Sequence, residues 1–210
     1  MEVNVHDLLR LKEHNQLVLA EAAPEWLRAS VERAPWVVVR RAARSGPLIP
    51  VGVRGFTRGE RFAAWVSAEH IAECVSPEQL AERIVWKQAV RSEQIRLFRA
   101  INELSGIYEQ YRMKWGPAGS IGFELASGVQ TISTTSDLDL IIRAALPLDP
   151  LLAARLHQLH KQQPIRVDVL IETPFGAVAL AEYVEREPFA PVLLRTGAGP
   201  VFVRNPWSSE

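Results

Sequence analysis

The 210-residue sequence predicts an α+β protein in two parts: a small β-rich module with helices over residues 1–80, and a mixed sheet with flanking helices over residues 81–210. Three observations predict this division. Short β-branched runs separated by glycine and proline fill the first third of the chain. A long helical pattern follows, and beyond it helices alternate with strands. At ~150 residues per domain, this length allows one or two domains.

The composition is that of an ordinary globular protein, with 48% hydrophobic and 23% charged residues. No apolar run approaches the ~18 residues that a membrane span needs. The first residues show neither the basic nor the apolar region of a secretory signal. The single cysteine, Cys74, excludes an internal disulfide and a cysteine zinc site. We therefore expect a cytoplasmic protein without a membrane partner.

The first part begins with a short helix at 24–34, where Pro24 suits a first-turn position. Three strands follow at 36–41, 49–54 and 61–66, because these runs are rich in β-branched and aromatic residues. Glycine and proline punctuate the segments between them. A small β-rich module is the simplest sum of these elements.

The bridge between the two parts is helical. Ser76 is suited to cap a helix that has Pro77 at its first position. From there to about Met113, apolar residues recur at steps of three and four, as at Ile95, Phe98, Ile101, Leu104 and Tyr108. Gly106 and the polar residues 87–92 are the expected points at which this pattern divides into separate helices.

The second part mixes both kinds of element. Its expected elements are a short strand and turn at 114–120, a helix at 121–127, a strand at 136–143, a helix at 150–162, a strand at 165–172, a helix at 176–184, and a hairpin of 193–196 with 201–204. Strands alternating with helices predict a mixed sheet with flanking helices.

Charge is balanced overall but unevenly distributed. The chain has 24 basic and 24 acidic residues, so it lacks a global signature of nucleic-acid binding. Residues 26–61 contain eight arginines and two acids, a net charge of +6. Two interpretations remain open for this segment: a solvated basic face, or a surface that docks an acidic partner or a phosphorylated ligand. The arginines concerned are Arg40, Arg41, Arg44, Arg54, Arg58 and Arg61, with Arg44 and Arg58 the best candidates for contact because they lie near loops.

An acidic cluster carries the clearest chemical signal. Asp137 and Asp139 are two residues apart in an expected strand, so their side chains share a face. Two carboxylates ~4–5 Å apart repel by about 3–4 kcal/mol at an effective dielectric of ~20, and a cation removes that cost. Asp168 lies in a second strand of similar character. If these strands are neighbours, the three aspartates can hold two Mg²⁺ ions, or Mn²⁺, for phosphoryl chemistry.

The alternative is that Asp137 and Asp139 form the wet face of an antiparallel strand whose dry face is Leu138, Leu140 and Ile142. The turn at Gly119 and Ser120 favours the active-site interpretation, because free backbone N–H groups in such a turn bind phosphate.

Other polar residues receive a simpler interpretation. His157 and His160 are three apart on an expected helix, and we favour a solvated helix face over a metal pair. Glu124 and Glu172 lie near the motif strands, where we favour ordinary surface acids over residues that support the site.

Gly-Ser followed by Asp-x-Asp and a later strand aspartate resembles the nucleotidyltransferase domain of the DNA polymerase β superfamily. Longer blocks are similar to the MdcG family, the malonate decarboxylase holo-acyl-carrier-protein synthases, which are phosphoribosyl-dephospho-CoA transferases. These blocks are WGPAGSIGFELASG (115–128), TSDLDLIIR (135–143), RVDVLIETPFGAVALAEY (166–183) and LLRTGAGPVFVRNPW (193–207), with HDLLRL (6–11), PWVVVRR (35–41), IPVGVRG (49–55) and RFAAWV (61–66) in the first part. The stretch from Ser120 to Asp137 is longer than in the tightest superfamily motifs.

The resemblance implies a polymerase-β-like nucleotidyltransferase domain after the β-rich module, and a specific reaction. Family members transfer a phosphoribosyl-dephospho-CoA group from triphosphoribosyl-dephospho-CoA to a serine of the apo acyl carrier subunit of malonate decarboxylase, releasing pyrophosphate. The family's catalytic aspartates correspond to Asp137 and Asp139. Asp168 would be a third ligand or the base, and Gly119 and Ser120 would hold the triphosphate.

Two rival functions remain. A minimal nucleotidyltransferase would move AMP from ATP onto a protein or RNA, using only the second part of the chain. A degenerate, non-catalytic domain would bind the carrier subunit as a scaffold, an interpretation that the intact pair Asp137 and Asp139 disfavours.

Overall fold

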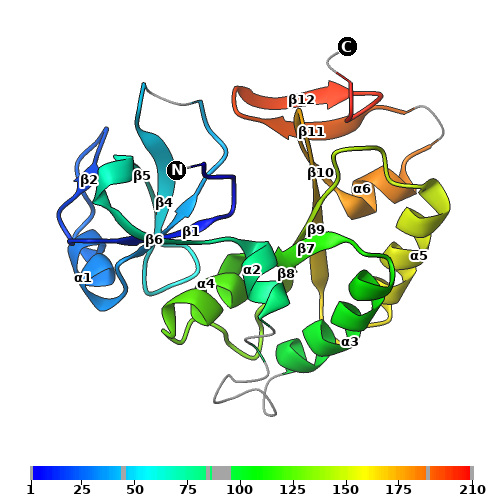
Figure 1. Cartoon of the computed structure of the whole chain (residues 1–210), viewed down its shortest axis with the longest axis horizontal. Coiled ribbons are helices and arrows are strands. Elements are labelled where there is room, and N and C mark those ends of the chain that lie inside the picture. The colour runs from blue at the N-terminus through cyan, green and yellow to red at the C-terminus, as the bar shows by residue number, and fades with distance from the viewer. Residues whose placement is uncertain (1, 44–45, 84–85, 87–95, 188–189, 209–210) are drawn as a thin grey trace.

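Two six-stranded sheets divide the chain, as the computed structural model in Figure 1 shows. The structure describes residues 2–43, 46–83, 86, 96–187 and 190–208. The first sheet uses strands from residues 8–75 and the second uses strands from residues 114–203. With six α-helices in the described part of the chain, the fold is a mixed α+β arrangement. No described helix combines the length and the apolar character needed to cross a membrane.

The first sheet is antiparallel throughout, in the order β2-β5-β4-β3-β1-β6. Its strands are β1 (Leu8–Leu11), β2 (Leu17–Val18), β3 (Trp36–Val39), β4 (Ile49–Arg54), β5 (Arg61–Val66) and β6 (Ile71–Val75). Helix α1 (Trp26–Arg33) packs against β4, and the short 3₁₀ helix η1 (Ala68–His70) precedes β6. The core is apolar and closed, since Leu9, Val37, Val51, Ala64 and Val66 have no exposed area.

The predictions for this part are confirmed for α1, β3, β4 and β5. They are incomplete, because β1, β2 and β6 were not predicted as strands. These three strands have two to five residues each. Such short runs carry too few residues to establish a two-residue period in the sequence.

The bridge contains two helices that differ in environment. Ser76 caps α2 (Pro77–Glu82) with a full capping box, in which the Ser76 hydroxyl accepts from Gln79 N. Helix α3 (Arg96–Gln110) runs through Gly106 without a break, contrary to expectation. Six of its buried residues pack into the core of the second sheet, and this packing outweighs the cost of one glycine. The break expected at 87–92, like Ile95, lies outside the described residues.

The second sheet has the order β12-β11-β10-β9-β8-β7. Its strands are β7 (Lys114–Pro117), β8 (Leu138–Arg143), β9 (Val167–Thr173), β10 (Gly176–Ala179), β11 (Val192–Thr196) and β12 (Gly199–Val203). Strands β8 and β9 are parallel and the other pairs are antiparallel. Helix α5 (Pro150–Lys161) lies between β8 and β9 in the chain and forms their crossover.

Helices cover one face of this sheet and leave the other turned toward the first part (Figure 1). Leu138, Leu140 and Ile142 of β8 pack in one core with the apolar faces of α3 and α5. Helix α4 (Gly119–Ser127) contacts both cores: Ile121 belongs to the core of the second sheet, and Phe123 packs with Leu8 and Trp36 of the first sheet. The open face between the two sheets is where polar side chains gather.

Two predictions for the second part are wrong in detail. The expected helix at 176–184 begins with strand β10, and only α6 (Leu180–Glu185) is helical. Residues 176–179 pair with β9 as the return arm of a hairpin, so tertiary pairing overrides the apparent helical pattern. Gly119 and Ser120, expected in a turn, form the first turn of α4.

Ion pairs join the two parts directly. Glu172 of β9 accepts from both Arg41 at 2.5 Å and His6 at 2.8 Å, each from the first part. Arg143 of β8 contacts Asp7 at 3.5 Å and also binds Glu78 of α2. Buried charges of this kind hold the two sheets in one orientation, which matters for a site built from both.

Candidate active site

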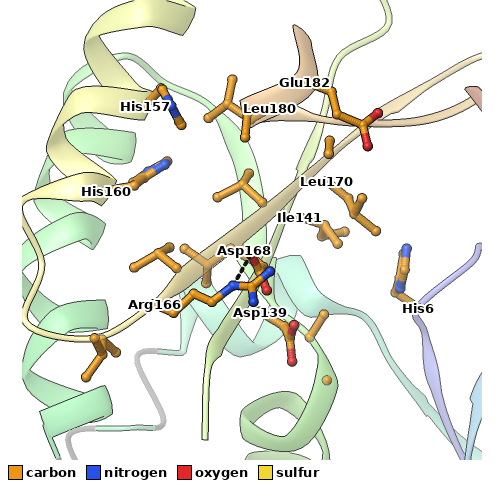
Figure 2. Close-up of a pocket in the computed structure, with 18 of the residues that line it drawn as sticks. His6, Asp139, Ile141, His157, His160, Arg166, Asp168, Leu170, Leu180 and Glu182 are labelled. Carbon is orange, nitrogen blue, oxygen red and sulfur yellow. Dashed lines mark hydrogen bonds and ion pairs between the residues drawn. The ribbon is translucent and has the colours of Figure 1, made fainter. Parts of the chain in front are cut away.

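The parallel pair β8–β9 brings two aspartates together that are distant in sequence. Asp139 and Asp168 are register partners, so they lie side by side on neighbouring strands and point to the same face. That face is the one opposite to Leu138 and Leu140, which are 0% and 1% exposed in the core. The two-residue period of each strand therefore places the acids in the space between the sheets. Figure 2 shows Asp139 and Asp168 close to each other beside Arg166.

Asp137 joins this pair from just outside the strand. It lies one residue before β8, and it lines a cavity of about 330 Å³ together with Asp139. Asp139 also lines a larger cavity of about 820 Å³ together with Asp168. Asp139 is therefore the acid common to both spaces, and the other two sequence-predicted carboxylates lie to either side of it.

The environment of Asp139 shows how close these charges are. Burial raises the pKa of Asp139, and the negative charges of Asp168 and Asp137 raise it further. Arg61 and Arg58 lower it in part. A buried carboxylate with two acidic neighbours holds its charge at a cost, and a cation bound among the three would remove that cost.

The start of helix α4 is pressed against the Asp139 carboxylate. Ala118 N donates to Asp139 O at 2.9 Å, which ties the turn before α4 to β8. Gly119 has a φ of +57°, and a Cβ placed there would lie 1.9 Å from Asp139 Oδ2. Only glycine satisfies both the left-handed backbone and this close approach. The first-turn N–H groups of α4 have no partner within the helix, so they are suited to an anion beside the acids.

Ser120 follows in the same turn and is 9% exposed. It lines the smaller cavity, and its carbonyl accepts from the Thr131 hydroxyl at 2.9 Å. Glu124, one helical turn later, accepts from Thr131 N and Ile132 N. Glu124 therefore fixes the loop that leads toward Asp137 and is not an ordinary surface acid, contrary to expectation.

The arginine-rich segment does not form one surface. Arg58 donates to Asp137 at 2.8 Å, and Arg54 and Arg61 line the smaller cavity with it. Arg41 binds Glu172, and Arg40 lies over the Trp65 ring at 5.0 Å. Arg44 lies outside the described residues. Three of the six arginines thus face the acids, and two are bound within the structure.

Metal ligation was expected of Asp137, Asp139 and Asp168. Across the described ranges, no three His, Cys, Asp or Glu residues are already arranged as a metal cluster. Asp137 is instead held by Arg58, and Asp168 accepts from Arg166 at 3.0 Å. The donor chemistry nevertheless fits Mg²⁺, because Asp139 shares one cavity with Asp137 and another with Asp168, and the negative charges of both neighbours raise the pKa of Asp139.

The larger cavity continues from the acids along the two strands. Ile141 and Leu170 come next on the same face, and His6 of the first part lies across from them (Figure 2). The cavity thus offers an apolar strip beside a charged end. This combination suits a ligand that has both an uncharged arm and phosphates.

The two helix histidines are buried, so the expected solvated face is wrong. His157 and His160 are 8% and 5% exposed. His160 shares a hydrogen bond of 2.7 Å with the Tyr108 hydroxyl, and His157 is paired with Glu185 at 2.9 Å. Glu172, expected at the surface, is also buried at 8% exposure. The sequence prediction for these three residues was wrong because their burial depends on packing between helices and strands that are distant in the chain.

Arg166 is the residue at the acids that sequence reasoning missed. It precedes β9 by one residue and its only signal was a position two residues before Asp168. Arg54 and Arg61 were noted for charge but not placed beside Asp139. Their in-register pairing across the β4–β5 hairpin could not be recognised without the strand register.

The smaller cavity has aspartates on one wall and arginines on the other. This arrangement is typical of an enzyme that transfers phosphoryl groups. Family models agree. The phosphoribosyl-dephospho-CoA transferase MdcG C-terminal domain matches residues 79–206, and the corresponding N-terminal domain matches residues 4–77. The chain belongs to this MdcG family of transferases.

Relatives that carry the name phosphoribosyl-dephospho-CoA transferase are similar over almost the whole chain. The protein of Azotobacter vinelandii is 38% identical over 205 residues, covering 96% of this chain and 93% of that protein. The protein of Klebsiella pneumoniae (strain 342) is 37% identical, covering 98% and 96%. The protein of Pseudomonas aeruginosa is 36% identical, covering 90% and 87%. No solved structure matches.

Proposed function

We propose that this protein transfers a phosphoribosyl-dephospho-CoA group from its triphosphate donor to a serine of an apo acyl carrier protein, and that pyrophosphate is released. The observation that carries the proposal is the gathering of Asp137, Asp139 and Asp168 beside the start of α4. Family membership supplies the group that is moved. The resemblance of the motif blocks to malonate decarboxylase carrier synthases supports the carrier subunit of that enzyme as acceptor.

The same arrangement supports a nucleotidyltransferase domain of the polymerase β kind for the second part. Gly119 and Ser120 begin a helix, Asp139 is in the adjacent strand, and Asp168 is its register partner. In this scheme the first-turn N–H groups of α4 hold the donor's phosphates. The apolar strip of Ile141 and Leu170 accommodates the uncharged arm of the dephospho-CoA portion.

In the reaction, the serine oxygen attacks the phosphorus nearest the ribose. A new P–O bond forms to serine, the bond to the second phosphate breaks, and pyrophosphate departs with that electron pair. We assign the proton of the serine hydroxyl to Asp168, because its side chain is 44% exposed and that of Asp137 is 20% exposed. An acceptor that arrives from solution therefore meets Asp168 first.

Asp137 and Asp139 complete the acid set with the role of metal ligands. Mg²⁺ bound by these aspartates, as one or two ions, would supply positive charge beside the phosphoryl oxygens. The raised pKa of Asp139 supports this role. Burial and two acidic neighbours make its negative charge unfavourable, and a bound cation would stabilise that charge.

The test is mass spectrometry of the apo carrier subunit after incubation with this protein, the donor and Mg²⁺. We expect a mass increase equal to the donor less pyrophosphate, and no increase for a carrier whose acceptor serine is alanine. ATP in place of the donor should give no product. An adduct of AMP on the carrier, or no adduct with any donor, would refute the proposal.

A further inference from the structure

The β4–β5 hairpin of the first part reaches the acids of the second. Arg54 ends β4 and Arg61 begins β5, and the two are register partners. Arg58 lies in the turn between them and bonds to Asp137. One hairpin therefore brings three guanidinium groups to the wall of the smaller cavity that faces Asp137 and Asp139.

The acids beside these three cations neutralise them only in part. In the ranges that the structure describes, Arg58 forms an ion pair with Asp137, whereas no carboxylate lies within ion-pair distance of Arg54 or Arg61. Burial lowers the pKa of Arg54, the positive charges of Arg61 and Arg58 lower it further, and the negative charge of Asp139 raises it in part. Arg54 and Arg61 thus hold like charges together without an ion-paired carboxylate of their own among the described residues, an arrangement that favours an anion bound between them.

The rest of this cavity also presents donors. Ser120 at the start of α4 lines it, and hydroxyl groups from the loop before β8 complete the wall, namely those of Thr131, Ser133, Thr135 and Ser136. Hydroxyl and guanidinium groups suit the oxygens of a polyphosphate. The cavity shares Arg61 and Asp139 with the larger one, so a ligand can extend from one to the other.

We propose that Arg54, Arg58 and Arg61 form the subsite for the donor's second and third phosphates, which leave as pyrophosphate. This inference rests on the proposed function and deepens it. The N-terminal module then completes the active site with its own charges. Arg58 has two roles. It binds a phosphate of the donor, and in doing so it leaves its ion pair with Asp137, which is weak because Arg58 is exposed. The Asp137 carboxylate is then available to bind a cation.

The test separates the donor from the carrier by using inorganic tripolyphosphate as the first probe, with calorimetry at low salt and without divalent cations. We expect Arg54→Gln and Arg61→Gln each to weaken tripolyphosphate binding at least tenfold. Arg28→Gln is the matched control, because Arg28 lies on the same module and, among the described residues, pairs only with Glu32 on the surface. Its binding should equal that of the unaltered protein. Thermal unfolding of each variant checks that it is folded. If the Arg54 variant does not fold, the variant of the exposed Arg61 tests the subsite by itself.

The second readout is transfer kinetics with both substrates varied. We expect the KM for the donor to rise at least tenfold in Arg54→Gln and Arg61→Gln, with the KM for the carrier unchanged. A rise in the carrier KM alone would assign the arginines to carrier docking and overturn the subsite. Unchanged tripolyphosphate binding would overturn it as well. If the unaltered protein transfers nothing, the proposed function fails, and tripolyphosphate binding still decides the subsite independently.

Discussion

The two sheets have equal numbers of strands but contribute differently to the site. The first sheet is antiparallel throughout, and it contributes the three arginines of the β4–β5 hairpin to the smaller cavity. The second contains the parallel pair β8–β9, which places Asp139 beside Asp168 although 29 positions separate them. A parallel pair needs a crossover, and the crossover here is α5, which covers the face away from the acids.

Charge follows the same division. Residues 26–61 carry a net charge of +6, so the rest of this neutral chain carries −6. The acids of the second sheet repel one another, and the arginines of the first partly offset that repulsion at Asp139. The comparison teaches that neither sheet holds a complete site. The predictions below test how firmly each contribution belongs to its region.

The largest effect is expected from Asp139→Asn, which should abolish transfer and yet raise the midpoint of thermal unfolding. The pKa of Asp139 is raised above its ordinary value of 3.8 by burial and by Asp168 and Asp137. Its ionised form is therefore disfavoured in the fold, and this cost is present at neutral pH. Asparagine keeps the shape and removes the charge. Mass spectrometry of the carrier and calorimetric unfolding without divalent cations measure both outcomes; near-normal transfer would refute the assignment.

Gly119→Ala should reduce transfer by roughly 10²-fold, the scale of effect produced by a displacement of about 1 Å at reacting groups. The new Cβ would lie 1.9 Å from Asp139 Oδ2, so α4 or the carboxylate must move. Gly128→Ala is the control, because Gly128 has a φ of +71° and no atom near its missing Cβ. Each variant should lose about 1–2 kcal/mol of stability from the left-handed backbone. Equal activities of the two variants would show that the contact is unimportant.

His160 makes the second region sensitive to pH. Burial lowers the pKa of His160 to about 4, with a smaller contribution from His157. Because the unfolded chain binds the proton first, stability should fall as pH decreases from 6.5 toward about 4. At 1.36 kcal/mol per pKa unit, the loss is about 3 kcal/mol. His160→Gln should remove that slope from denaturant-unfolding curves, and a slope unchanged in the variant would assign the pH dependence elsewhere.

Glu172→Gln should loosen the contact between the regions by about 2 kcal/mol, the scale of hydrogen bonds to charged groups. Burial opposes ionisation of Glu172, but the hydrogen bonds and charges of His6 and Arg41 prevail, and the net pKa lies below its ordinary value of 4.5. The stabilisation is therefore present above pH 4.5 and is lost as pH falls through the lower folded value.

The measurement for Glu172→Gln is urea unfolding at pH 7 and at acidic pH. Glu32→Gln is its control, since Glu32 pairs with Arg28 on the surface and should leave the midpoint unchanged. If the two variants unfold alike, the Glu172 cluster does not hold the regions together.

Prediction from sequence succeeded where a local signal was strong. The β-branched runs at β3, β4 and β5 and the helix cap at Ser76 were recognised, because their residues determine backbone preference directly. It failed at β1, β2 and β6, which are short, and at β10, whose conformation depends on pairing with β9. At the site, the alternation of acids and apolar residues placed Asp139 and Asp168 on the strand faces opposite to the core.

The sequence by itself therefore determined which residues could carry the chemistry: two strands that each carry a carboxylate, and a Gly-Ser pair with backbone N–H groups suited to a phosphate. Only the tertiary structure decided what faces them. Strand register set Arg54 beside Arg61 and aimed the hairpin at Asp137 and Asp139. Packing also buried His160 and Glu172, which look like surface residues in the sequence. The physical reason is that period and propensity are local properties, whereas register, burial and charge pairing are set by contacts between segments far apart in the chain.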